Sequence, residues 1–134
     1  MRFRQLHIRY TEISRGPGAL GDLLAARWPA TLAEREWRPR TDLYETGDAW
    51  TVQVELAGVN EDDFEILLYE DTLLVRGSRR GVIPPSEVRF HVAEIRYGPF
   101  QLEMPLPFHS RTEEATARYD RGFLFVTLPK GATA

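Results

Sequence analysis

The chain has 134 residues, no cysteine and a formal net charge of -3, and 43% of its residues are hydrophobic and 28% charged. This composition predicts one globular domain with short flanking segments, because a wholly disordered chain is less apolar. The weak negative charge gives no reason to expect nucleic acid as a partner, and the lack of cysteine excludes disulfides, thiolate catalysis and cysteine-ligated zinc. Neither a secretory signal pattern nor a long apolar run is present, so we expect a cytoplasmic protein with no membrane partner.

Residues 1–36 are interpreted as an N-terminal arm that is partly helical or disordered. Four apolar residues share one face of a short amphipathic helix that ends at Pro29, and we refer to them as the arm stripe: Leu20, Leu23, Leu24 and Trp28. A helix this short is marginal in isolation, so the stripe must contact something else. We expect it to pack on a partner subunit or on an unfolded client protein, with packing on its own domain as the alternative.

Within the arm, Leu6 and Ile8 lie one strand step apart and would share a face of an extended chain. The pair is interpreted as part of a short strand or a coil. The alternative is that the two side chains dock into an apolar groove.

The compact part begins near Trp37. Residues 50–56 alternate apolar and polar side chains, which predicts a half-buried strand between a turn at Gly47 and a break at Gly58. The acidic residues 60–63 are interpreted as a solvated turn, because a calcium-binding EF-hand loop would require glycine at the position of Glu65.

Residues 64–77 are predicted to form a hairpin with a three-residue loop at 70–72. Its first strand carries Phe64, Ile66 and Leu68 on one face, and Leu67 and Tyr69 on the other. Apolar residues on both faces indicate that something covers the outward face.

Residues 78–97 form an insertion that contains a short alternating segment with Val88, Phe90 and Val92. A loop of about 20 residues is uncommon in a compact domain unless it has a function. The segment is predicted to pair with the edge of another sheet and to supply the dimer interface. The alternative is a loop that folds on its own domain.

Two further strands are predicted at 100–106 and 124–128, because apolar residues recur at every second position. Gly122 is expected to take a positive φ in the turn before the last strand. Pro105, Pro107 and Pro129 lack the backbone donor that a ladder needs, so they are expected where strands stop.

No active site is expected. His7, His91 and His109 lack metal-binding spacing, no serine lies in a Gly-x-Ser-x-Gly motif, and no phosphate loop occurs. We therefore expect no catalytic residue, no metal and no cofactor, and a protein that is not an enzyme.

Several separate motifs agree in spacing with one known family: Trp37-x-Pro39-x-x-Asp42, Tyr97-Gly98-x-Phe100, Leu106-Pro107, Ala117-x-Tyr119 and Gly122-Phe123-Leu124-x-Val126-x-Leu128-Pro129-Lys130. The chain resembles the alpha-crystallin domain of small heat shock proteins, in their bacterial and plant-like branch. With the strand pattern, the resemblance predicts an all-β, immunoglobulin-like sandwich of two antiparallel sheets over residues 37–130.

The resemblance implies an ATP-independent holdase chaperone whose partners are unfolded or partly folded client proteins. The expected client contacts are the arm stripe and a groove lined by Phe64, Ile66, Leu68, Leu124 and Val126. It further implies a homodimer formed by strand exchange through the insertion, or a larger oligomer through the arm. The alternative function is a CS-type adaptor that recognises one folded partner, although such domains lack the long insertion.

The chain departs from the family pattern at two places. Residues 131–134 are too short for the family's C-terminal Ile-x-Ile/Val extension, so we expect assembly to stop at the dimer or to use Leu6 and Ile8 as a substitute. Leu102 stands where the family usually has an arginine near the dimer contact, so an ion pair at that contact is not expected to carry over.

Overall fold

The computed structural model describes residues 36–69, 71–81, 87–106 and 114–130, together with the backbone of residues 4–6 and 9–10. The arm stripe, Ile8 and the tail 131–134 lie outside these described residues. The described residues form strands and one short 3-10 helix: β1 (Arg4–Leu6), β2 (Arg9–Tyr10), β3 (Thr41–Glu45), β4 (Ala49–Glu55), η1 (Glu61–Asp63), β5 (Phe64–Tyr69), β6 (Thr72–Arg79), β7 (Gly98–Pro105), β8 (Thr116–Asp120) and β9 (Phe123–Pro129).

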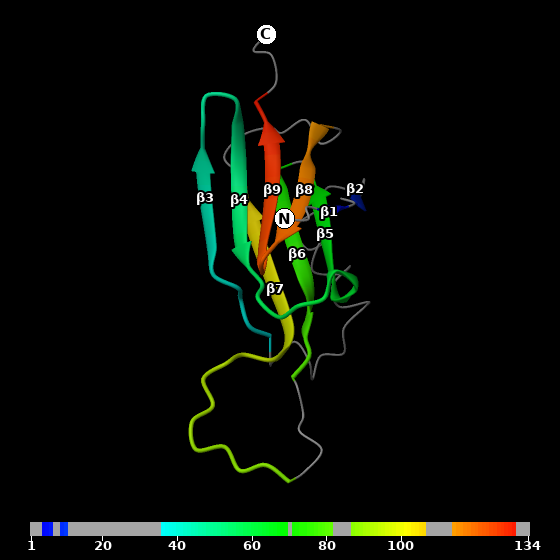
Figure 1. Cartoon of the computed structure of the whole chain (residues 1–134). Helices are drawn as coiled ribbons and strands as arrows, with labels where there is room; N and C mark the ends of the chain where they lie inside the picture. The colour runs from blue at the N-terminus through cyan, green and yellow to red at the C-terminus, as the bar shows by residue number, and fades with distance from the viewer. Residues whose placement is uncertain are drawn as a thin grey trace.

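The strands form two sheets that lie face to face (Figure 1). The five-stranded sheet has the order β1-β8-β9-β4-β3, and the four-stranded sheet has the order β2-β5-β6-β7. The predicted all-β sandwich of two sheets is confirmed, and the strand pairs are antiparallel with one exception. β2 runs parallel to β5, because it comes from the arm and not from a hairpin with its neighbour.

The core lies between the two sheets and follows the period of two that the sequence shows. It is formed by alternate residues of the strands and by neighbouring loop residues: Val52, Val54, Leu56, Val59, Ile66, Leu68, Leu73, Val75, Phe100, Leu102, Leu106, Ala117, Leu124, Val126 and Leu128. Each fully buried leucine, isoleucine or phenylalanine side chain contributes about 1.5–3 kcal/mol relative to an exposed one. The alternation therefore accounts both for the strands and for the way the sheets pack.

The turns agree with the expected turn residues except at one hairpin. Arg121 and Gly122 connect β8 to β9 with φ values of 49° and 86°, as a type I′ turn requires, so the positive φ expected at Gly122 is confirmed. β7 and β9 end at Pro105 and Pro129. The loop between β5 and β6 is one residue shorter than predicted, because Thr72 pairs with Tyr69 as part of β6.

Candidate interaction surfaces

The insertion leaves a row of apolar side chains uncovered. Val88, Phe90, Val92 and Ile95 are 41%, 70%, 73% and 66% exposed. Residues 87–97 form no strand within the described part of the chain, and the loop extends beyond the end of the sandwich (Figure 1). Single exposed apolar residues are ordinary, whereas several along one segment mark an interaction surface.

The base of the insertion is fixed by Trp37. The Trp37 Nε1 group donates to the carbonyl oxygen of Gly98 at 3.2 Å, and the Trp37 ring packs on Phe100 with centroids 5.3 Å apart. The Arg79 guanidinium lies 4.5 Å from the centre of the Trp37 ring and donates through Nη1 to the carbonyl oxygen of Arg96 at 3.0 Å. These contacts join both ends of the insertion to the chain just before β3, so the exposed row leaves the sandwich from a defined base.

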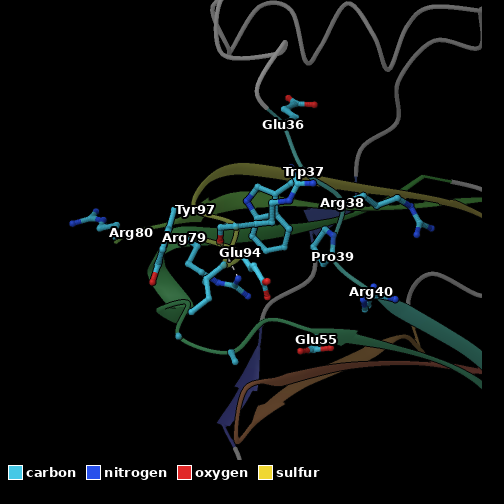
Figure 2. Close-up of a pocket in the computed structure, with 14 residues that line it drawn as sticks. Glu36, Trp37, Arg38, Pro39, Arg40, Glu55, Arg79, Arg80, Glu94 and Tyr97 are labelled. Atoms are coloured by element: carbon cyan, nitrogen blue, oxygen red, sulfur yellow. Dashed lines mark hydrogen bonds between the residues drawn. The ribbon is translucent and has the colours of Figure 1, made fainter. Parts of the chain in front are cut away.

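A hollow of about 1080 Å³ lies beside this base. Its charged lining mixes arginines with carboxylates: Arg38, Arg40, Arg79, Arg80, Arg96, Glu36, Glu55 and Glu94. Figure 2 shows the Arg80 side chain directed away from the other labelled residues, and its side chain is 77% exposed. The hollow is thus an open recess between the sandwich and the insertion.

The acidic residues before β5 are engaged locally. Glu61–Asp63 form η1, and an Asp63 carboxylate oxygen accepts a hydrogen bond from Arg80 at 3.0 Å. Among the residues that the structure describes, no group of three or more histidine, aspartate or glutamate side chains is placed to hold a metal ion.

No helix in the described part of the chain is long and apolar enough to cross a bilayer. The cytoplasmic location stays a prediction.

The β3 strand is a free edge within the described residues. It ends the five-stranded sheet and pairs with β4 on one side. Its Tyr44 side chain is 42% exposed. An edge strand presents backbone donors and acceptors that a further strand can pair with.

At the opposite border of the sandwich, the edge strands pair with two short strands of the arm. β1 pairs with β8 in the five-stranded sheet, and β2 pairs with β5 in the four-stranded sheet. The two edges lie close together, because the rings of Phe64 on β5 and Tyr119 on β8 have centroids 5.5 Å apart. Leu6 lies in β1, as the strand interpretation predicted.

The residues assigned to a groove from the sequence lie mostly inside. Ile66, Leu68, Leu124 and Val126 are at most 2% exposed and belong to the core, whereas Phe64 is half-buried. β9 has a neighbour on both sides, β8 and β4, so it forms no edge. The border consists instead of β5 and β8, which pair with the arm strands β2 and β1, and the sequence did not reveal it because an alternating pattern does not determine the order of strands in a sheet.

Tyr119 is a residue of this border that the sequence analysis named only within a motif. Its hydroxyl donates to the carbonyl oxygen of Leu56 at 2.6 Å. Burial raises the pKa of the Tyr119 phenol above its ordinary value of 10.0, because burial disfavours the charged form. The contact ties the β8 edge to the end of β4 and the loop that follows it.

Leu102, the departure from the family arginine, lies on β7 opposite Val75 and is 0% exposed. Its side chain fills the core between the sheets. An arginine with this orientation would bury an unpaired charge, which explains why an apolar residue suits this chain.

The comparisons with known proteins agree with the fold. A sequence profile of the Hsp20/alpha crystallin family matches residues 42–134. Small heat shock protein C2 of Rickettsia felis is 32% identical over 101 residues, which are 75% of this chain and 66% of that protein. A 16.6 kDa heat shock protein of Oryza sativa subsp. japonica is 32% identical over 98 residues, 70% of this chain and 65% of that protein. The chain thus spans about two thirds of the length of these two relatives.

Solved structures resemble the same region. Heat shock protein 16.0 from Schizosaccharomyces pombe matches with a TM-score of 0.66 and 27% identity over 74% of this chain and 92% of that one. A small heat-shock protein from Xylella fastidiosa has the same TM-score of 0.66 and 27% identity over 74% of this chain and 91% of that one. Profile, relatives and fold therefore agree, and the chain belongs to the Hsp20/alpha crystallin family of small heat shock proteins.

Proposed function

We propose that this chain is an ATP-independent holdase chaperone that binds non-native proteins and prevents their aggregation under heat or other stress. Its family supports a chaperone function in general. The observation that carries the finer proposal is the pairing of residues 4–6 and 9–10 with the edges of β8 and β5. These edges accept an extended segment of chain, and an unfolded protein offers its backbone in that form.

Such binding needs no chemical step. Hydrogen bonds to a sheet edge come from the backbone, so one surface can accept clients of unrelated sequence. By mass action, a protein that binds non-native chains lowers the concentration of free aggregation-prone species. In this proposal residues 4–10 give way to clients, the arm stripe adds apolar contact, and neither a cofactor nor a catalytic residue takes part.

We also propose a homodimer formed by strand exchange, in which residues 88–92 of one subunit pair with the β3 edge of the other. The exposure of Val88, Phe90 and Val92 supports it, together with the one-sided pairing of β3. Burial of a side chain such as Phe90 would contribute about 1.5–3 kcal/mol in each subunit. Contacts made by the arm would build any larger assembly; for the Xylella fastidiosa relative a distinct high order structure is described.

The dimer is tested by the Phe90→Asp variant of the full chain. A carboxylate in the apolar contact should shift the sedimentation coefficient from dimer to monomer. His91→Asp is the matched control, because it places the same charge one residue later, where a strand points to its other face. A wild-type monomer at high concentration, or a Phe90→Asp variant that stays dimeric, would refute the strand exchange.

The holdase proposal is tested by heating several unrelated client proteins with the full chain and measuring light scattering. We expect roughly stoichiometric suppression of aggregation for most clients. Replacing Leu23, Leu24 and Trp28 by serine should weaken suppression several-fold, whereas Asp22→Ser with Ala25→Ser, on the opposite side of such a helix, should leave it unchanged. Suppression of no client would contradict the proposal and favour the CS-type adaptor.

A further inference from the structure

The recess beside the base of the insertion carries a surplus of positive charge. Five arginines and three glutamates line it. Within the described part of the chain, these arginines form a single ion pair, which joins Arg80 to Asp63. The Arg79 Nε group is buried and has no hydrogen-bond partner among the described residues. Each guanidinium offers five donors, so the recess is short of acceptors and suits a further carboxylate.

Two of these arginines lie at the start of the free β3 edge. Arg38 and Arg40 are exposed on either side of Pro39, which is buried. The backbone N–H of Glu55 donates to the carbonyl oxygen of Arg40 at 3.0 Å, so the pairing with β4 continues beyond the first residue of β3. A strand that adds to the β3 edge would therefore pass both guanidinium groups at one end.

The apolar row of the insertion is bounded by a glutamate on each side. Glu87 precedes Val88, and Glu94 follows Val92 by two residues. Both glutamates are exposed, and neither forms an ion pair with another described residue. In an exchanged dimer, the direction of the added strand decides which of the two carboxylates meets the arginines.

The register of the added strand follows from its apolar residues. Phe90 is the centre of the alternating segment and is 70% exposed, and Leu43 is the residue of β3 that packs against the core. With Phe90 opposite Leu43, Val88 and Val92 fall on the same face and extend the core. A shift by one residue would turn this face to solvent, so burial of the apolar row fixes the register.

The direction of the strand follows from the lengths of its two connections. Residues 93–97 join the segment to β7, and residues 80–87 join it to β6. At about 3.3 Å per residue, the first connection reaches about 17 Å and the second about 26 Å. The insertion and the start of β3 lie at the same end of the sandwich (Figure 1), so an exchange about a twofold axis brings this end of both subunits together. The shorter connection then keeps Val92 near the start of the partner's β3, which makes the paired strands antiparallel.

Antiparallel pairing in this register places Glu94 opposite Pro39. We propose that the recess of each subunit binds the carboxylate of Glu94 of the partner subunit, with Arg38 and Arg40 as the donors. This contact rests on the proposed strand exchange, and it gives the dimer an ion pair that Leu102, buried in the core, does not supply. A second copy of the chain is thus recognised by charge as well as by its apolar row.

Charge reversal in the full chain tests the contact. Glu94→Arg turns attraction into repulsion at two symmetric contacts, so the dimer dissociation constant measured by sedimentation should rise about tenfold. Arg38→Glu with Arg40→Glu should raise it to a similar extent. Glu87→Arg is the matched control, because antiparallel pairing places this glutamate opposite Thr46, beyond the other end of β3, and it should leave the constant unchanged.

Mixing the two weakened variants shows whether the contact joins two subunits. A dimer of one Glu94→Arg chain with one chain that carries Arg38→Glu and Arg40→Glu has opposite charges at both contacts. It should therefore form with about the wild-type dissociation constant, whereas each variant alone stays weak. A contact within one chain would not be restored by mixing, because each chain would keep its own mismatch.

A Glu94→Arg dimer as tight as the wild type, weakening by Glu87→Arg instead, or a mixture that stays weak would overturn the proposal. Each of these results leaves the strand exchange standing if the wild type is a dimer, whereas a wild-type monomer refutes the exchange and the contact with it. The variants change exposed side chains, and circular dichroism checks that they fold. If Arg38→Glu with Arg40→Glu fails to fold, Arg40→Glu alone takes its place in the mixture.

Discussion

The β4 strand and the insertion carry the same alternating pattern with opposite outcomes. In β4, Val52 and Val54 are 0% exposed, because strands flank β4 on both sides and the four-stranded sheet covers their face. In the insertion, Phe90 and Val92 are 70% and 73% exposed. An alternating sequence specifies which side chains share a face, and the surrounding chain decides whether that face is covered.

One chain is sufficient to bury the apolar residues of the sandwich, whereas the apolar residues of the insertion stay exposed. The sandwich closes its core with its own strands, so its stability should depend on residues at the contact between the sheets. The insertion lacks a covering layer, so its residues should affect association and leave the stability of the sandwich nearly unchanged.

Leu102→Arg, which restores the residue usual in the family, should have the largest effect on the closed region. It would place an unpaired guanidinium in the core and lower the free energy of unfolding by about 3–5 kcal/mol, a large part of the stability of a small domain. Urea unfolding followed by tryptophan fluorescence measures the change. Glu103→Arg, on the exposed neighbouring residue, should change stability by no more than about 0.5 kcal/mol. A Leu102→Arg protein with the wild-type midpoint would show that the side chain does not face the core.

Gly77→Ala should have the next largest effect. A Cβ atom at this position of β6 would collide with the backbone oxygen of Asp63 and lie 2.7 Å from the Cα atom of Phe64. Backbone atoms cannot rotate away, so we expect a loss of about 1–3 kcal/mol in the same unfolding experiment. Gly47→Ala is the matched control, because no atom lies within 4 Å of its added Cβ. Equal midpoints for the two variants would mean that β5 and β6 are not packed this closely.

Tyr119→Phe should have a smaller effect. The Leu56 carbonyl would lose the hydroxyl donor but keep the N–H of Val59 at 3.2 Å, so we expect a loss of about 0.5–1.5 kcal/mol at neutral pH. Tyr44→Phe, on the exposed β3, should lose less. Equal losses in the two variants would argue against the buried contact.

The same residue predicts a dependence on pH. The pKa of Tyr119 is raised in the folded protein, so its contribution to stability is fully present below the ordinary tyrosine pKa of 10.0 and is lost as pH rises through the higher folded value. Unfolding measured between neutral pH and strongly alkaline pH should show this loss in the wild type and a smaller loss in Tyr119→Phe. Parallel pH curves would contradict the assignment.

The sequence predicted the closed region because its signals are local. Alternation identified the strands around Val52 and Leu124, and turn residues identified the hairpin at Gly122. It could not place β1 and β2, because strands of two or three residues gain their position from tertiary pairing. It also could not predict the contact between Tyr119 and Leu56, which are 63 residues apart.

The candidate interaction surfaces were predicted less well, because they too depend on tertiary packing that a local pattern does not show. The sequence indicated an insertion with an alternating segment, whose role in a dimer stays a prediction, and it assigned core residues such as Ile66 and Val126 to a groove. Burial depends on which two sheets meet, and that information is not contained in one strand. The border between β5 and β8 became visible only when the arm strands were located on it.

Amide hydrogen exchange of the full chain at low and high concentration tests most directly whether residues 88–92 pair with the β3 edge of a second subunit. The account predicts that amides of residues 88–92 and of β3 become slower together as concentration rises. Amides of β9, which pairs on both sides within one chain, should change least. Exchange of residues 88–92 at the rate of an unpaired chain at every concentration would contradict the account.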